Sequence, residues 1–157
     1  MIYNHKPSAY FHKYALTKTT PLYPFGYGLS YTDFEYSKPN LSTPILNSNE
    51  TVSVTVSVTN TGNYDGDEVV QMYIRDQISS ATRPVKELKG YQRIFLKKGE
   101  TKQVSFEINK ETLAFYDIDM NYIVEPGDFS IMIGSSSDSK HLKSTTLKVN
   151  KRMTVDE

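Results

Sequence analysis

Residues 51–59 read TVSVTVSVT, so every second residue in this stretch is a valine. Side chains alternate between the two faces of a β-strand, so all of these valines fall on one face and the Ser and Thr residues on the other. β-branched side chains also suit a pleated, half-buried surface. The pattern predicts a strand whose buried face carries Val52, Val54, Val56 and Val58.

The same alternation recurs at six other places. It is clear in EVVQMYIRD, KQVSFEI, DFSIMIG and TTLKV, weaker around Ile94 and Leu96, and present near the start at Phe34 and Tyr36. Period two over such short runs is typical of strands with one buried face. The residues expected to face the core are Val70, Met72, Ile74, Val104, Phe106, Ile108, Phe129, Ile131, Ile133, Leu147 and Val149.

Turn-forming residues separate these runs. NTGNYDGD at 60–67 and SSSDS at 135–139 are polar loops, and Glu-Pro-Gly-Asp at 125–128 is a turn signal. Lys-Lys-Gly-Glu at 97–100 predicts the tip of a hairpin that joins the weak strand before it to the strand after it. Residues 76–90 predict a long connection.

The sequence offers little helix. No segment of useful length after residue 20 carries a helical period, although Asn109 is placed to cap one short turn through Leu113 and SAYFHKYAL at 8–16 predicts a brief helix. About seven short strands with turns between them indicate an all-β protein, an antiparallel β-sandwich of immunoglobulin or fibronectin type III-like architecture.

Composition narrows the function classes. A chain of 157 residues suits one domain, and the absence of Cys excludes thiol catalysis, thiolate zinc sites and disulfides. With 18 basic and 18 acidic residues the formal net charge is zero, so electrostatics gives no reason to expect nucleic acid or an anionic membrane as partner. The apolar runs are too short to span a bilayer, and MIYNHKPSAYFHK lacks the apolar core of a signal peptide, so the compartment stays open.

The aromatic residues are unevenly distributed. Ten of the 19 Tyr and Phe residues lie in residues 1–36, most of which has neither strand nor helix period. The Pro and Gly residues of TTPLYPFGYGLS favour an extended, bent path. We therefore expect residues 1–30 to form an aromatic-rich N-terminal arm, residues 31–150 the fibronectin type III-like domain, and residues 151–157 a tail.

Exposed apolar surface usually marks an interaction site, so the arm is expected to pack on this sandwich, on another domain or on a sugar. The candidate interdomain or sugar contacts are Tyr23, Phe25, Tyr27 and Tyr31. Packing against upstream domains is favoured, because Tyr and Phe are enriched in interface cores and the chain has no Trp to serve as a sugar platform.

Other polar clusters favour structural roles. Asp65, Asp67 and Glu68 lie in a Gly-rich turn, which favours turn chemistry over a glycosidase carboxylate pair or a calcium site. His5, His12 and His141 have no metal-ligand spacing, and Ser30 in GLSYT does not match a nucleophile elbow. We expect no catalytic, metal or cofactor site.

Charged residues near the middle of the chain are also expected to be structural. Lys97, Lys98 and Lys102 are read as a solvated hairpin end. Glu87, with Lys86 and Lys89 beside it and Arg83 before it, is expected to form ion pairs that fix the long connection.

Five motifs in order carry a resemblance to a known family. The chain resembles the C-terminal fibronectin type III-like domain of glycoside hydrolase family 3, the β-glucosidases and β-xylosidases, over residues 3–149. YNHKP at 3–7 is similar to the stretch that leaves the preceding domain. The motifs are PLYPFGYGLSYT (21–32), VTNTGNYDGDEVVQMYI (58–74), RPVKELKGYQRI (83–94), KKGETKQVSFEI (97–108) and VEPGDFSIMIGSSS (124–137).

The resemblance implies a multidomain glycosidase whose nucleophilic Asp and acid/base residue lie on upstream domains that this chain does not contain. No catalytic residue is carried over. We therefore expect an accessory domain that braces catalytic domains in cis, is inactive alone, and comes from a periplasmic or secreted parent. The alternatives are a free-standing carbohydrate-binding module for β-linked oligosaccharides, or a scaffolding module that joins a separate catalytic polypeptide.

Overall fold

The structure is a computed structural model that describes residues 22–155. The helix predicted at 8–16, and His5 and His12, lie outside the described residues. The described elements are β1 (Phe34–Tyr36), β2 (Asn40–Leu41), β3 (Ile45–Leu46), β4 (Val52–Asn60), β5 (Gly66–Asp76), β6 (Glu87–Leu96), β7 (Thr101–Ile108), α1 (Lys110–Leu113), β8 (Phe115–Tyr116), β9 (Tyr122–Val124), β10 (Gly127–Gly134), β11 (Lys143–Val149) and β12 (Met153–Thr154). All seven predicted strands are present. None of the described helices is long and apolar enough to cross a membrane.

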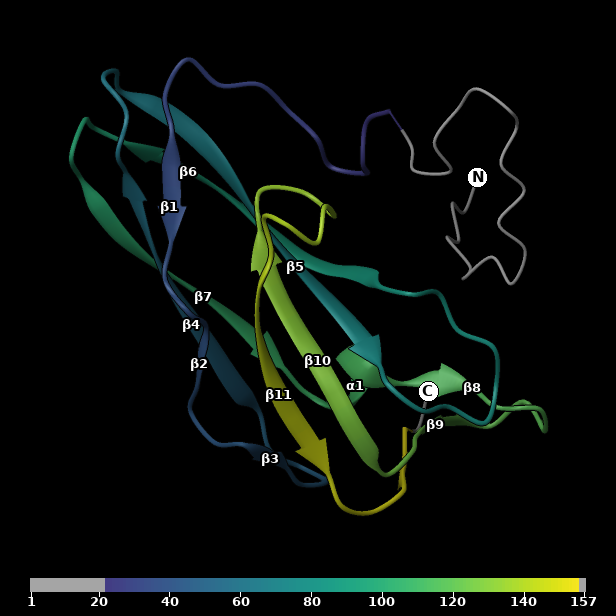
Figure 1. Ribbon diagram of the computed structural model, residues 1–157. Coiled ribbons are helices and arrows are strands. Elements are labelled where there is room, and N and C mark those ends of the chain that lie inside the picture. Colours follow the sequence, from purple (N-terminus) through teal and green to yellow (C-terminus); the bar gives the residue numbers. More distant parts are fainter. Residues whose placement is uncertain (1–21, 156–157) are drawn as a thin grey trace, which may run out of the picture.

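Two sheets form the sandwich (Figure 1). In the first sheet β7 pairs along one edge of β4, while β1 and β2 pair with β4 at successive positions along its length. The second sheet has the order β3-β11-β10-β5-β6. Its pairs are antiparallel except for β3 and β11, which run parallel. A small third sheet, β12-β9-β8, lies at the end of the sandwich where β8 and β9 are labelled in Figure 1.

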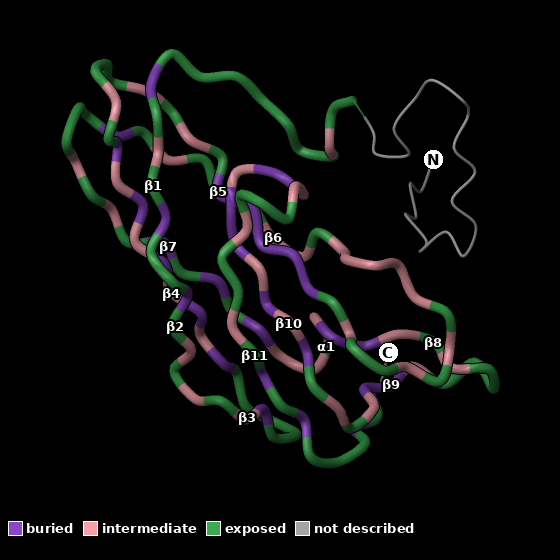
Figure 2. Tube along the Cα trace, in the orientation of Figure 1, coloured by how far each residue is buried: buried purple, intermediate pink, exposed green. Residues whose placement is uncertain are grey.

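The predicted inward positions form the core. The four valines of β4 are at most 1% exposed, and Ile131 and Ile133 of β10 are fully buried. Figure 2 colours the residues by burial, and along β4 buried residues alternate with intermediate ones. Burying one such aliphatic side chain stabilises the fold by roughly 1.5–3 kcal/mol, so the alternation read from sequence accounts for the main driving force.

The turn at Lys97–Glu100 forms, but the predicted hairpin is wrong. The amide of Glu100 donates to the carbonyl of Lys97 (2.9 Å), with Gly99 at φ +75°. However, β6 pairs with β5 and β7 pairs with β4, so the turn carries the chain from one sheet to the other. The reason is a long-range contact: the turn is hydrogen-bonded to Asn60 at the end of β4, by Asn60 N to Glu100 O (2.9 Å) and Gly99 N to Asn60 O (3.0 Å).

The side chain of Asn60 is fully buried and holds this corner together. Its amide nitrogen donates to the carbonyls of Tyr64 (2.7 Å) and Leu96 (3.1 Å), and its oxygen accepts from Thr32 Oγ1 (2.7 Å). Buried amides are tolerated when they are satisfied in this way. Asn60 therefore fixes both sheet crossings, the one after β4 and the one after β6.

Two further expectations are corrected at the boundaries of elements. The connection predicted at 76–90 is shorter, because β6 already begins at Glu87. Glu87 pairs with Ile74 of β5, and the pairing continues back along β5 to Gly66. The tail predicted at 151–157 is in part core: β12 pairs with β9, and Met153 and Val155 are only 4% and 6% exposed. The alternation of Met153 and Val155 was the signal for this strand, but two apolar residues are too few to distinguish a strand from a tail.

The helical turn after β7 is confirmed. Asn109 Oδ1 accepts from the backbone N of Thr112 at 2.9 Å, and the backbone N of Asn109 donates to Thr112 Oγ1 at 3.4 Å. This reciprocal cap satisfies amides that a helix terminus otherwise leaves unpaired. The turn ends at Leu113, which is fully buried and anchors the turn to the core.

Candidate functional site

The described part of the arm is fixed to the sandwich by its backbone. Pro24 to Tyr27 form a turn closed by the Tyr27 amide on the Pro24 carbonyl (3.1 Å), with Gly26 at φ +77°. The carbonyl of Phe25 accepts from the backbone amide of Ser137 (2.8 Å) in the loop after β10. A positive φ is unfavourable for residues with a Cβ, so glycine is required at the bend of this turn.

Gln71 and Tyr73 of β5 complete the attachment. Their alternation with Val70, Met72 and Ile74 predicts that they face solvent, yet Gln71 is 5% exposed and Tyr73 2%. Gln71 Nε2 donates to the carbonyls of Gly26 (3.1 Å) and Ser135 (2.6 Å), and Gln71 Oε1 accepts from the Tyr73 hydroxyl (2.5 Å). Burial raises the pKa of Tyr73 to about 12.

The four predicted contact residues all expose their aromatic rings. Tyr23, Phe25 and Tyr27 are 66%, 55% and 49% exposed, and Tyr31 is 96% exposed. The rings of Tyr23 and Tyr27 contact each other, with centroids 5.3 Å apart. The structure brings these two together beside Phe25, while Tyr31 lies beyond the pinned turn. The arm therefore presents an apolar surface on a backbone that is held in place.

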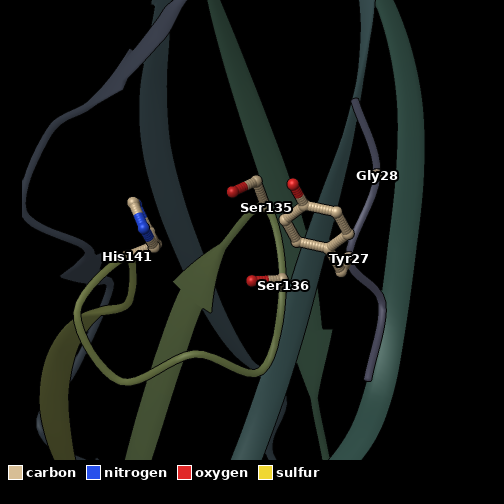
Figure 3. Close-up of a pocket in the computed structure, with 5 residues that line it drawn as sticks. All are labelled: Tyr27, Gly28, Ser135, Ser136 and His141. Carbon is tan, nitrogen blue, oxygen red and sulfur yellow. The ribbon is translucent and has the colours of Figure 1, made fainter. Parts of the chain in front are cut away.

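A pocket of about 170 Å³ lies between the arm and the loop after β10. It is lined by Tyr27, Gly28, Ser135, Ser136 and His141 (Figure 3). Tyr27 and Gly28 come from the arm, while the serines and His141 come from the loop that joins β10 to β11. Sequence reasoning singled out Tyr27 and His141 separately, but their separation of 114 positions in the sequence hid their proximity.

An ion-pair network fixes the connection between β5 and β6. Arg83 contacts Asp76 (Nη1 to Oδ2, 3.3 Å) and Glu87 (Nη2 to Oε1, 3.0 Å), and Lys89 contacts Glu87 at 2.9 Å. The Arg83 guanidinium also lies 4.8 Å from the centroid of the Phe115 ring. The pairing predicted for Glu87 is confirmed with Arg83 and Lys89.

Asp76 is the member that sequence reasoning missed. Its side chain is 1% exposed, and burial raises the pKa of its carboxyl even though Arg83 acts in the opposite direction. Lys86 takes a different partner from the one expected, since its Nζ donates to Ser137 O (2.7 Å) and Ser139 Oγ (3.1 Å). The connection is thus tied to the same loop that lines the pocket.

Asp65 and Asp67 of the 60–67 turn, and Glu68 directly after it, each have a different partner. Asp65 accepts from the Lys98 amide (2.7 Å), and Asp67 pairs with Arg93 (3.0 Å). Burial raises the pKa of Glu68, whose carboxylate accepts from the Val69 amide (2.8 Å). Among the residues that the structure describes, no group of three or more His, Cys, Asp or Glu side chains is arranged to hold a metal ion.

Comparison with known proteins identifies relatives over most of the chain. Residues 68–137 match the fibronectin type III-like domain family. The chain is 49% identical to a β-xylosidase of Formosa agariphila over 87% of the chain and 19% of that protein. It is 48% identical to a periplasmic β-glucosidase of Salmonella typhimurium over 84% of the chain and 17% of that protein.

Solved structures of β-glucosidases show the same similarity. A β-glucosidase from Erythrobacter marinus superposes with a TM-score of 0.85 at 42% identity, covering 94% of this chain and 19% of that one. A β-glucosidase from Listeria innocua gives a TM-score of 0.82 at 34% identity, covering 96% of this chain and 22% of that one. The chain spans about a fifth of the length of the relatives it matches. Residues 68–137 therefore form a fibronectin type III-like domain, and the homologues of the chain are glycoside hydrolase family 3 β-glucosidases and β-xylosidases.

Proposed function

We propose that this chain is a non-catalytic accessory domain that braces the catalytic domains of a family 3 glycoside hydrolase. The observation that carries the proposal is the anchored arm, which exposes Tyr23, Phe25 and Tyr27 while its backbone is hydrogen-bonded to the sandwich. Interface cores are enriched in such aromatic residues. A surface that is already ordered loses little conformational entropy when a neighbouring domain packs on it.

The proposed division of the chain follows from the same features. Residues 1–30 are proposed as the arm that reaches the upstream domains, and the sandwich from residue 31 as the brace. The sandwich extends to Val155 rather than to residue 150, because Met153 and Val155 are buried in its core. The only partners proposed for the brace are glycosidase domains, in cis in a longer protein.

Retaining glycoside hydrolysis needs two carboxyl groups about 5–5.5 Å apart that flank the sugar. Sequence reasoning considered Asp65, Asp67 and Glu68 for this role, and they are instead engaged by Lys98, Arg93 and the Val69 amide, respectively. The chain alone is therefore expected to leave aryl β-glucosides and β-xylosides intact. Turnover well above that in buffer, retained after repurification, would contradict the accessory role.

A domain exchange tests the bracing role directly. This chain would replace the matching region of the Formosa agariphila β-xylosidase, to which it is 49% identical. We expect a folded, active chimera whose thermal midpoint falls when Tyr23, Phe25 and Tyr27 are all changed to Ser. The matched control changes Tyr91 and Phe95 of β6, which are 70% and 47% exposed but lie outside the arm. Equal losses in both variants would overturn the assignment of the arm as the interface.

A scaffolding role is the second candidate, and it differs only in placing the catalytic domains on a separate polypeptide. The same exposed arm supports it. Mixing the chain with the Formosa enzyme that lacks its own matching region separates the two roles. Co-elution of the two polypeptides on size exclusion favours scaffolding, whereas function only in the fused chimera favours the accessory domain.

A further inference from the structure

We propose that the pocket between the arm and the loop after β10 binds a single pyranose unit of a neutral saccharide. The pocket is lined by Tyr27, Gly28, Ser135, Ser136 and His141. This binding role goes beyond the bracing function, because it needs no neighbouring domain.

Both walls of the pocket are held in place by hydrogen bonds within the chain. Gln71 Nε2 donates to Gly26 O in the arm and to Ser135 O in the loop, so one side chain joins the two walls. The Ser137 amide adds a direct bond to Phe25 O (2.8 Å). A pocket that is formed in advance has little ordering cost to recover on binding.

The loop wall has its own internal bonds. The His141 amide donates to Asp138 O (3.0 Å), and the Asp138 amide donates to Ser136 Oγ (3.4 Å). At the base of the loop, a Cβ built on Gly134 would lie 2.4 Å from the carbonyl oxygen of His141. The backbone therefore approaches Gly134 so closely that the position of His141 is fixed relative to β10.

The lining offers unused hydrogen-bonding groups. The Tyr27 hydroxyl, the Ser135 hydroxyl and the His141 imidazole make no hydrogen bond with the described part of the chain, and Figure 3 shows them at the pocket. Hydroxyls and a neutral imidazole each donate and accept, as sugar hydroxyls do. The Tyr27 ring adds an apolar surface, which suits the C–H face of a pyranose.

Charge and size narrow the ligand class. The lining contains neither Lys, Arg, Asp nor Glu, which disfavours phosphates and other anions. Lys86 of the adjacent connection does not supply a free cation either, because its Nζ already donates to Ser137 O and Ser139 Oγ. A volume of about 170 Å³ is well below the roughly 300–1,000 Å³ of drug-sized sites. One sugar ring fits this space, and a longer chain would extend into solvent.

Gly28 provides a way to block the pocket without disturbing its walls. A Cβ built on Gly28 meets no atom within 4 Å, and its φ lies outside the left-handed region. Because Gly28 lines the pocket, Gly28→Leu adds a bulky side chain at its wall. Tyr31→Ala is the matched control, because Tyr31 also belongs to the aromatic-rich stretch, is 96% exposed and does not line the pocket.

The test is a titration of the isotope-labelled full chain with glucose, xylose, cellobiose and xylobiose, followed by amide chemical shifts. We expect saturable shifts at Gly28, Ser135, Ser136 and His141 with at least one sugar, and a dissociation constant of about millimolar, which is typical of a small ligand. Gly28→Leu and Ser135→Ala should each weaken binding at least about fivefold, while Tyr31→Ala leaves it unchanged.

Three results would overturn the proposal. They are the absence of saturable shifts up to about 50 mM of every sugar, shifts confined to other surfaces, and undiminished binding in a folded Gly28→Leu variant. Each is independent of the domain exchange, which measures stability of a fused enzyme and no sugar affinity. Failure of one proposal therefore leaves the other intact.

Discussion

The side-chain amide of Gln71 on β5 donates to the carbonyl oxygen of Gly26 in the arm over 3.1 Å, across 45 residues of sequence. This contact converts the outer face of β5 from a solvent face into a docking site for the chain's own N-terminal segment. The exposed aromatic side chains of the arm and the pocket beside them both depend on it.

Replacing Gln71 by Leu removes the link between the arm and the loop after β10. It leaves the carbonyls of Gly26 and Ser135 and the hydroxyl of Tyr73 without this partner, so we expect a loss of about 1–3 kcal/mol in the free energy of unfolding by urea. Gln92→Leu is the control, since its amide also donates to a carbonyl, that of Ser105 (2.6 Å), but in an exposed position. A loss in the control as large as that in Gln71→Leu would show that the link between the arm and the loop has no special weight for stability.

Replacing Gly26 by Ala displaces the arm by two effects. Its φ of +77° is unfavourable for Ala, and the new Cβ would lie 2.0 Å from Gln71 Oε1. Gly99→Ala has the same backbone strain at φ +75° but no atom within 4 Å, so it should cost only about 1–2 kcal/mol. We expect Gly26→Ala to increase proteolysis at residues 22–28, with Gly99→Ala leaving cleavage there at the wild-type rate. Equal protection in both variants would show that the close approach is unimportant.

Replacing Arg83 by Met leaves the buried carboxylate of Asp76 without its partner. Breaking a buried pair in this way costs about 3–5 kcal/mol at neutral pH, measurable by urea unfolding. Arg93→Met is the control and should cost at most about 1 kcal/mol, because its pair with Asp67 is 71% and 43% exposed.

The pH dependence of Arg83→Met follows from the pKa of Asp76. Burial already raises this pKa above its ordinary value of 3.8, and loss of Arg83 removes an effect that lowers it. The folded variant then binds a proton more tightly than the unfolded chain, so its stability rises as pH falls through the folded-state pKa towards the unfolded value. The deficit relative to wild type should therefore shrink between about pH 7 and pH 4, and a deficit that grows would contradict this.

Truncation after Lys151 removes β12 and the buried residues Met153 and Val155. Loss of two core side chains should lower the free energy of unfolding by roughly 3–6 kcal/mol, at about 1.5–3 kcal/mol each. Removing only residues 156–157 serves as the control and should leave the thermal midpoint unchanged. A tail without a structural role would give the same midpoint for both truncations.

Removing residues 1–20 should raise solubility while the chain stays folded. The described hydrophobic core is built from residues at Tyr36 and beyond, all of which the truncated chain retains. Saturation concentration and thermal unfolding of the two chains test this directly. Loss of folding in the truncated chain would show that the segment completes the core, which contradicts its assignment to the arm.

The sequence by itself determined the strands and their faces. Strict alternation at Val52, Val54 and Val56 is a local property, since a strand has period two wherever it lies, and Asn109 caps a turn three residues away. The ordered motifs also identify the family. These inferences need only neighbours in sequence, and all of them hold in the structure.

Only the tertiary structure decided which strands pair and which polar residues are buried. Alternation in β6 and β7 is compatible with a hairpin, but Asn60 draws their turn across to the other sheet. The alternation in β5 predicts that Gln71 faces solvent, but the arm covers it. Local sequence likewise does not show that Asp76 is buried in an ion pair with Arg83. The physical reason is that pairing and burial depend on contacts between residues far apart in sequence, which local periodicity does not encode.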